Sequence, residues 1–154
     1  MLLKTHIVFN LFFFILSYNF FNLSFLGFLS FIFFILGTFI PDIDSKLSKI
    51  GKKKIFRVLQ FFVKHRGFMH SLFFIIFLFF ILYFLPSSLR TYFCFGAFLH
   101  LFLDSLTVNG TYPLYPLKFK IKGFIKTGKL FEKIIFISFI FLDISLFLFK
   151  LIVF

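Results

Sequence analysis

Histidine and acidic side chains of the kind that bind metal ions recur along this chain beside the ends of its apolar runs. His100 and Asp104 are four residues apart, so a helix would place them on one face. Neutral imidazole and carboxylate groups are the usual protein ligands of Zn²⁺ and of Mn²⁺ or Fe. We therefore treat all four histidines and four of the five acidic residues as one candidate metal site, which consists of His6, Asp42, Asp44, His65, His70, His100, Asp104 and Glu132.

A site with this many ligands predicts hydrolytic chemistry. Metal ions lower the pKa of bound water and stabilise both the attacking and the leaving oxygen when a phosphoester is cleaved. One to three divalent ions would fit, most simply zinc, with manganese or iron as alternatives. Arg66 lies between His65 and Gly67, so it is either a phosphate contact or one more basic residue that sets membrane topology.

Each candidate also has a simpler explanation when it is taken alone. The pair His100 and Asp104 can be a structural hydrogen bond, and the carboxylate of Asp44 can cap a turn. Asp42 can be a loop residue, and His6 can lie at a membrane interface. The prediction of a metal site therefore depends on the whole set. Asp143 lies apart from the set, within the last apolar run, and we leave it out of the site.

The composition excludes an ordinary soluble domain. Of the 154 residues, 61% are hydrophobic, the mean hydropathy is +1.08, and several apolar runs approach the roughly 18–20 residues that cross a bilayer. Cys94 is the single cysteine, so no intramolecular disulfide can form. We predict an all-α, polytopic membrane protein with one domain over residues 1–154. Its transmembrane helices, about five in number, are expected near residues 5–21, 23–40, 67–85, 89–107 and 131–152.

Two basic segments, residues 41–66 and 108–131, separate these predicted helices. Pro41 ends the second helix, because proline disfavours helical geometry in the residue before it. Residues 55–63 of the first segment are expected to form a short interfacial helix. With five crossings, one side of the membrane holds all but two of the 17 Lys and Arg residues, the exceptions being Arg90 and Lys150.

This charge distribution predicts the orientation of the chain. The positive-inside rule places the N-terminus in the cytoplasm and the C-terminus outside the inner (cytoplasmic) membrane. The net charge of +12 is explained by topology and by attraction to anionic lipids, so nucleic-acid binding is not expected. The same topology gathers the eight candidate site residues at the cytoplasmic face, although the histidines were not used to derive it.

The motifs together resemble those of the YdjM-type family of inner-membrane metal-dependent hydrolases. The matching residues cover nearly the whole chain in the family's order: Thr5-His6, Pro41-Asp42-Ile43-Asp44, His65-Arg66-Gly67, His70-Ser71-Leu72, His100 with Asp104, Thr107 and Gly110, and Thr127-Gly128 followed by Glu132. That family is distantly similar to the zinc-dependent phospholipase C superfamily. The resemblance implies as ligands His6, Asp42 or Asp44, His65 or His70, His100 and Asp104, with one of the aspartates as general base.

We therefore expect a membrane-embedded hydrolase that cleaves a phosphoester at the cytoplasmic face. The headgroup depth of the site and the surrounding lysines favour a phospholipid or a lipid-linked phosphate as the substrate. The alternative is a membrane protein without enzymatic activity. In that case the same ligands would serve a transporter or a metal-stabilised scaffold for a partner protein. Asp42, Asp44 and Arg66 are the expected catalytic residues of the hydrolase.

Overall fold

The computed structural model describes residues 1–17, 24–45, 48, 51–62 and 66–153. Regular structure in these residues is helical, beside two isolated β-bridges that pair Thr107 with Ile125 and Thr111 with Ile121. The all-α prediction is therefore confirmed for this part of the chain. The helices are α1 (Leu3–Ser17), α2 (Phe25–Phe39), α3 (Arg57–Phe62), α4 (Leu72–Ile81), α5 (Ser87–Ser105) and α6 (Leu130–Val153), with the short 3₁₀ helices η1 (Pro41–Asp44), η2 (Lys54–Phe56) and η3 (Phe68–His70).

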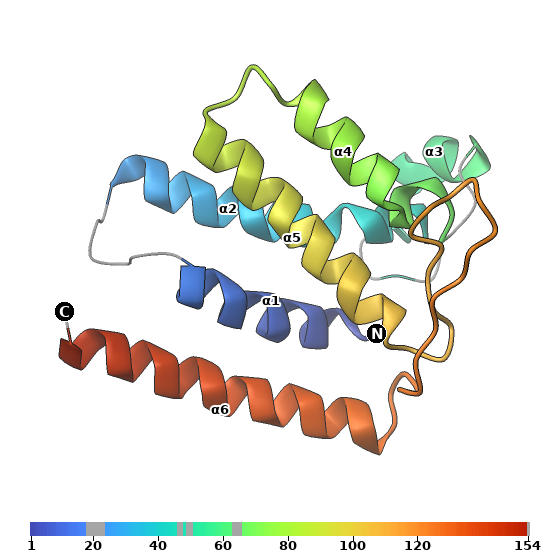
Figure 1. Cartoon of the computed structure of the whole chain (residues 1–154). Coiled ribbons are helices and arrows are strands. Elements are labelled where there is room, and N and C mark those ends of the chain that lie inside the picture. The colour runs from blue at the N-terminus through green and yellow to red at the C-terminus, as the bar shows by residue number, and fades with distance from the viewer. Residues whose placement is uncertain (18–23, 46–47, 49–50, 63–65, 154) are drawn as a thin grey trace.

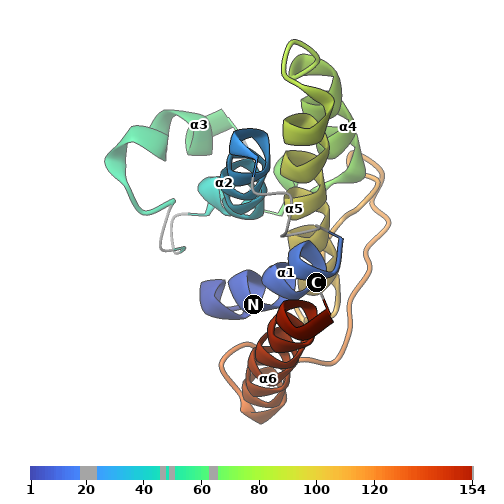
Figure 2. The same ribbon diagram turned by 90° about the vertical axis from the view of Figure 1, so that its left-hand side faces the viewer.

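The helices are stacked in an order that differs from their order in the sequence. α5 packs along α2, α4 lies against α5, and α1 lies between α6 and the α2–α5 pair (Figures 1 and 2). The N-terminus, the segment with η1, α3 and η3, and the loop from 106 to 129 gather at one end, which we call the polar end (Figure 1). The C-terminus and the α4–α5 connection lie at the other end.

Two glycines allow α2 and α5 to touch backbone to backbone. A Cβ atom built on Gly37 would lie 1.9 Å from the carbonyl oxygen of Phe93, and one on Gly96 would lie 2.3 Å from the carbonyl oxygen of Phe34. Neither position has room for a side chain. Small residues that let helix backbones approach closely are a common device of membrane helix packing.

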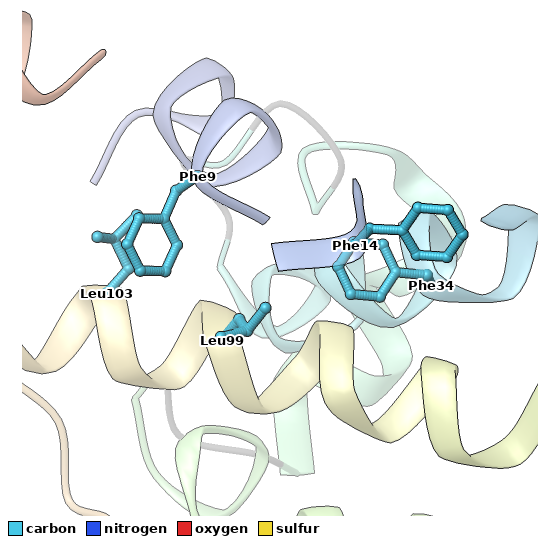
Figure 3. Close-up of a cluster of buried hydrophobic side chains, with 5 residues drawn as sticks. All are labelled: Phe9, Phe14, Phe34, Leu99 and Leu103. Atoms are coloured by element: carbon cyan, nitrogen blue, oxygen red, sulfur yellow. The ribbon is translucent and has the colours of Figure 1, made fainter. Parts of the chain in front are cut away.

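A cluster of apolar side chains holds α1 against the α2–α5 pair. It contains Phe9 and Phe14 from α1, Phe34 from α2, and Leu99 and Leu103 from α5, all buried (Figure 3). The rings of Phe14 and Phe34 have centroids 5.0 Å apart. These contacts hold α1, which carries His6, against the two helices whose ends carry other candidate site residues.

Helix lengths test only part of the predicted membrane topology. The apolar helix Phe25–Asp44, which is α2 continued into η1, has 20 residues, and α6 has 24, so both are long enough to cross a bilayer. α1 has 15 residues and α4 has 10. Ten helical residues extend only about 15 Å. The structure thus supports two candidate spans, and the count of about five crossings remains a prediction.

The close contact of α2 and α5 predicts that Gly37→Val destabilises the protein. The new side chain would collide with a backbone carbonyl, and overpacking of this kind costs about 1–3 kcal/mol or more. The matched control is Leu36→Val, which changes a neighbouring residue whose side chain is exposed. Thermal unfolding in detergent should show a Tm lower by roughly 5 °C for Gly37→Val and almost unchanged for the control. Equal Tm values for the two variants would contradict this account of the helix contact.

Candidate metal centre

Four separate segments deliver the candidate site residues to the polar end. His6 lies in the first turns of α1, Asp42 and Asp44 in η1, His70 in η3, and His100 and Asp104 on one face of α5. Pro41 occupies the first position of η1, directly after α2. The tight 3₁₀ turn that follows projects the two aspartates in different directions, because only residues three apart are aligned on such a turn.

His100 has its ring orientation fixed by the backbone of α2. Its Nδ1 lies 2.8 Å from the carbonyl oxygen of Thr38. Since a carbonyl oxygen can only accept, Nδ1 is the protonated nitrogen and Nε2 carries the free lone pair. Nε2 is buried, makes no hydrogen bond, and lies 3.8 Å from Oδ1 of Asp42. This arrangement of one tethered and one open nitrogen is typical of a metal-binding histidine.

His6 and Asp104 form the second side of the centre. Nε2 of His6 lies 3.3 Å from Oδ1 of Asp104. The His6 ring is stacked on the ring of His100, with centroids 3.9 Å apart and an interplanar angle of 6°. All three side chains are buried. Two imidazoles and a carboxylate therefore face one another in a space that excludes water.

His70 closes the centre from the side of η3. Its Nδ1 lies 3.2 Å from Oδ2 of Asp44, and its Nε2 lies 3.7 Å from Oδ2 of Asp104. Asp44 also accepts a hydrogen bond of 3.1 Å from the backbone N–H of Arg66. Asp44 therefore lies behind His70, where it orients the imidazole, whereas Asp42 faces the centre. The sequence left these two aspartates equivalent.

Two overlapping groups of described residues have ligand atoms within 4.8 Å of one another. They are His6, His100 and Asp104, and Asp42, His70 and His100. Both groups use His100, whose single open nitrogen can bind only one ion. The two groups therefore overlap at His100, and its open nitrogen could serve an ion in only one of them at a time. Asp104 directs its two oxygens toward different histidines, which is the arrangement that would bridge to a second ion.

Arg66 lies at the edge of this centre in a strained conformation. Its φ of 60° is rare for a residue other than glycine. The guanidinium group donates to the carbonyl oxygen of Gly110 at 2.7 Å and lies 3.3 Å from Oδ2 of Asp104. Its side chain is 18% exposed, so part of it can be reached by a ligand.

Glu132 belongs to neither metal-binding group, and its two carboxylate oxygens are occupied by other hydrogen bonds. Its Oε1 accepts from the N–H of Leu2 at 2.6 Å and from the hydroxyl of Thr5 at 3.0 Å. Its Oε2 accepts from the N–H of Gly128 at 2.5 Å. These bonds join the start of α6 to the start of α1. The geometry places Glu132 as a structural carboxylate, while its predicted part in metal binding gains no support.

One predicted residue, His65, lies outside the described residues. Asp143 is buried in α6 and lines a separate cavity of about 370 Å³ together with Leu11 and Ile15. Lys150 donates a hydrogen bond of 2.5 Å to the carbonyl oxygen of Ile15.

Sequence analysis did not identify several polar groups that lie around the centre. Nδ2 of Asn10 donates to the hydroxyl of Thr38 at 2.8 Å and to the carbonyl oxygen of Gly96 at 3.0 Å. Asn10 is four residues after His6, so its place on the same face of an apolar helix was an available signal. The α-amino group of Met1 forms an ion pair with Oδ1 of Asp104 at 2.5 Å, and no sequence pattern indicates that contact.

Comparisons with known proteins agree with this description. The helices and the buried His and Asp cluster define a helical membrane protein with a candidate metal centre. The family model for the YdjM inner membrane protein matches residues 1–153, and the chain belongs to that family. It is also 35% identical over 106 residues to the uncharacterized protein YvsG of Bacillus subtilis (strain 168), a match that covers 65% of this chain and 66% of YvsG, just under two thirds of that protein. No solved structure matches the chain.

The bonds of Glu132 predict that Glu132→Ala lowers stability whether or not metal is present. The substitution leaves three donors without their acceptor, at a cost of about 1–3 kcal/mol for each one that stays buried. Thermal unfolding should show the same loss with and without a chelator. Metal content per folded protein should stay at the wild-type value. A variant of unchanged stability that has lost metal would instead make Glu132 a ligand.

Proposed function

We propose that this protein is a membrane-embedded, metal-dependent hydrolase that cleaves a phosphoester of a phospholipid or of a lipid-linked phosphate. The observation that carries the proposal is the cluster of three histidines and two aspartates at the polar end, drawn from four chain segments and buried except for Asp42, which is partly exposed. Structural polar residues are seldom gathered in this way inside an apolar protein, because burying them is costly unless they are paired or bind a metal.

The distances within the cluster are compatible with ligands that share a metal ion. Ligands held about 2.0–2.1 Å from a tetrahedral zinc ion are about 3.4 Å apart. Nε2 of His6 lies 3.3 Å from Asp104 and Nε2 of His100 lies 3.8 Å from Asp42. Ordinary N–H···O hydrogen bonds are shorter, at about 2.7–3.2 Å. His6, His100 and Asp104, with Asp42 and His70, are therefore the residues that would hold the ion.

The bound ion would supply Lewis acidity and a water of lowered pKa for attack on phosphorus. In the hydrolysis, the water oxygen forms the new bond to phosphorus, the ester P–O bond breaks, and the leaving oxygen is released as an alcohol. Asp42 is the best placed base, because its side chain is 17% exposed while those of Asp44 and Asp104 are 0% and 3% exposed. Arg66 would pair with the phosphate oxygens, and Asp44 would keep His70 in position.

The membrane setting favours a lipid substrate. Large apolar side chains are exposed along α2, α4 and α6, among them Phe28, Phe80 and Ile152. This surface is suited to acyl chains, and the polar end with its basic segments is suited to headgroups. We propose a multi-pass arrangement in the cytoplasmic membrane, with the polar end and N-terminus in the cytoplasm and the C-terminus outside. The metal is zinc in this proposal, with manganese or iron as the alternatives.

Metal content tests the proposal directly. Wild-type protein purified in detergent should contain one or more equivalents of zinc or manganese by elemental analysis. His100→Ala and Asp104→Ala should each lose that metal while remaining monodisperse. Asp143→Asn is the matched control, because it changes a buried acidic residue away from the cluster, and it should retain wild-type metal. A wild type that binds no metal even when metal is supplied would refute the metal centre.

Phosphoester cleavage is the second test. Release of phosphate-bearing products from phospholipid in mixed micelles, followed by phosphorus NMR, should stop on chelation and return when zinc is added. Asp42→Asn should reduce the rate by about 100-fold or more, because it removes the proposed base. Full metal content with no cleavage of any phospholipid would favour a transporter or a metal-stabilised scaffold over the hydrolase.

Cysteine labelling tests the proposed orientation. In a Cys94→Ser background, Ser87→Cys introduces a thiol in the α4–α5 connection, and Lys129→Cys introduces one before α6. Both positions are exposed. A membrane-impermeant maleimide should label the first variant in intact cells and the second only after lysis. Labelling of both variants in intact cells would contradict the proposed topology.

A further inference from the structure

A cavity of about 420 Å³ lies beside the metal centre, on the far side of Arg66. The residues that give it its chemistry are Arg66, Tyr112, Tyr115, Leu117, Lys118 and Lys120. Its volume lies within the range of about 300–1,000 Å³ that is usual for pockets that bind small ligands. The candidate ligands of the metal centre do not line it, and it plays no part in holding a metal.

The charged side chains that line this cavity are all basic. Arg66, Lys118 and Lys120 line it, and no acidic side chain is among its lining residues. Two tyrosines add hydroxyl groups that can donate hydrogen bonds. Nζ of Lys120 also lies 5.6 Å from the ring centre of Tyr112, in a cation–π contact. Guanidinium, ammonium and phenol groups together are the donors that recognise a phosphate.

Backbone contacts hold the walls of the cavity in place. The N–H of Leu72, at the start of α4, donates to the carbonyl oxygen of Pro113 at 2.8 Å. Thr111 and Ile121 exchange two backbone hydrogen bonds of 2.9 and 3.0 Å. Arg66 is tied to the same loop through Gly110. The backbone that carries the donors, and the Arg66 side chain, are thus held in place without a ligand, which lowers the entropic cost of binding.

The wall from residue 117 to 122 has alternating character. Leu117, Phe119 and Ile121 are 61%, 57% and 42% exposed, and a lysine follows each of them. Residues 118–120 adopt no helix or turn. Leu117 lines the cavity together with Lys118 and Lys120, so this segment offers exposed apolar side chains, suited to acyl chains, next to its lysines.

We propose that this cavity binds the phosphate group of an anionic membrane lipid and presents it to the metal centre through Arg66. The inference rests on the proposed function, because the cavity is the binding half of the hydrolase site. Arg66 joins the two halves, with one amino group 3.3 Å from Asp104 and its side chain lining the cavity. The exposed apolar side chains of Leu117, Phe119 and Ile121 favour a lipid over free phosphate.

Binding to a non-hydrolysable ligand tests the cavity without depending on turnover. The probe is the phosphonate analogue of phosphatidic acid, in which a CH₂ group replaces the ester oxygen, added to purified wild-type protein and followed by native mass spectrometry. The variant Lys118→Ala/Lys120→Ala should bind it about 10-fold more weakly. Lys126→Ala/Lys129→Ala, which removes two lysines outside the cavity, is the matched control and should bind within about twofold of wild type.

Two further binding measurements distinguish a lipid phosphate from acyl chains alone and from free phosphate. Diacylglycerol with the same acyl chains should bind much more weakly than the phosphonate lipid, and millimolar inorganic phosphate should displace little of it. Equal binding of diacylglycerol, equal weakening by the two lysine pairs, or full displacement by inorganic phosphate would each overturn the proposal. Metal content measured on the same samples reports on the hydrolase separately, because the cavity variant should keep its metal.

Discussion

The hydrogen bond from His100 to the carbonyl oxygen of Thr38 is the contact on which the candidate centre depends. It forms only because Gly37 and Gly96 let the backbones of α2 and α5 touch. The carbonyl of Thr38 lies in the last turn of α2, where helix carbonyls lack a partner in their own ladder, and here it fixes an imidazole on the neighbouring helix. The open Nε2 of His100 then faces Asp42, which the same helix delivers a few residues later. The contact between α2 and α5 thus positions both His100 and Asp42.

Because the carboxylates of this cluster are largely buried, their charges need partners. A carboxylate inside an apolar protein is costly unless cations or donors surround it. Asp104 meets that condition with the Met1 amino group, Arg66 and two histidines around its two oxygens. Asp44 meets it with His70 and the N–H of Arg66. A divalent cation at the centre would act in the same direction, because it neutralises Asp42 and Asp104 together.

Sequence reasoning predicted the helices, and it grouped several residues that the structure brings together at the polar end, because both inferences depend on local patterns. Apolar runs predict helices, and a spacing of four placed His100 and Asp104 on one face. It could not separate Asp42 from Asp44, since that difference arises from the direction of a single 3₁₀ turn. It also placed Glu132 with the ligands, because only the tertiary structure brings Leu2 and Gly128 to its oxygens. The length of α4 was overestimated, since hydropathy alone does not show where an apolar helix ends.

The candidate centre has a buried side and a partly exposed side. His6, His70 and His100 are closed off by helices, whereas Asp42 and Arg66 keep part of their side chains open. Arg66 holds that place in a left-handed conformation, fixed by Asp44 through its N–H and by Gly110 through its guanidinium. Strain is retained at such a residue only when the surrounding structure enforces it. The buried histidines thus lie on the closed side of the cluster, and the partly exposed side chains of Asp42 and Arg66 lie on the side that a ligand could reach, which is the arrangement that the proposed cleavage of a phosphoester requires.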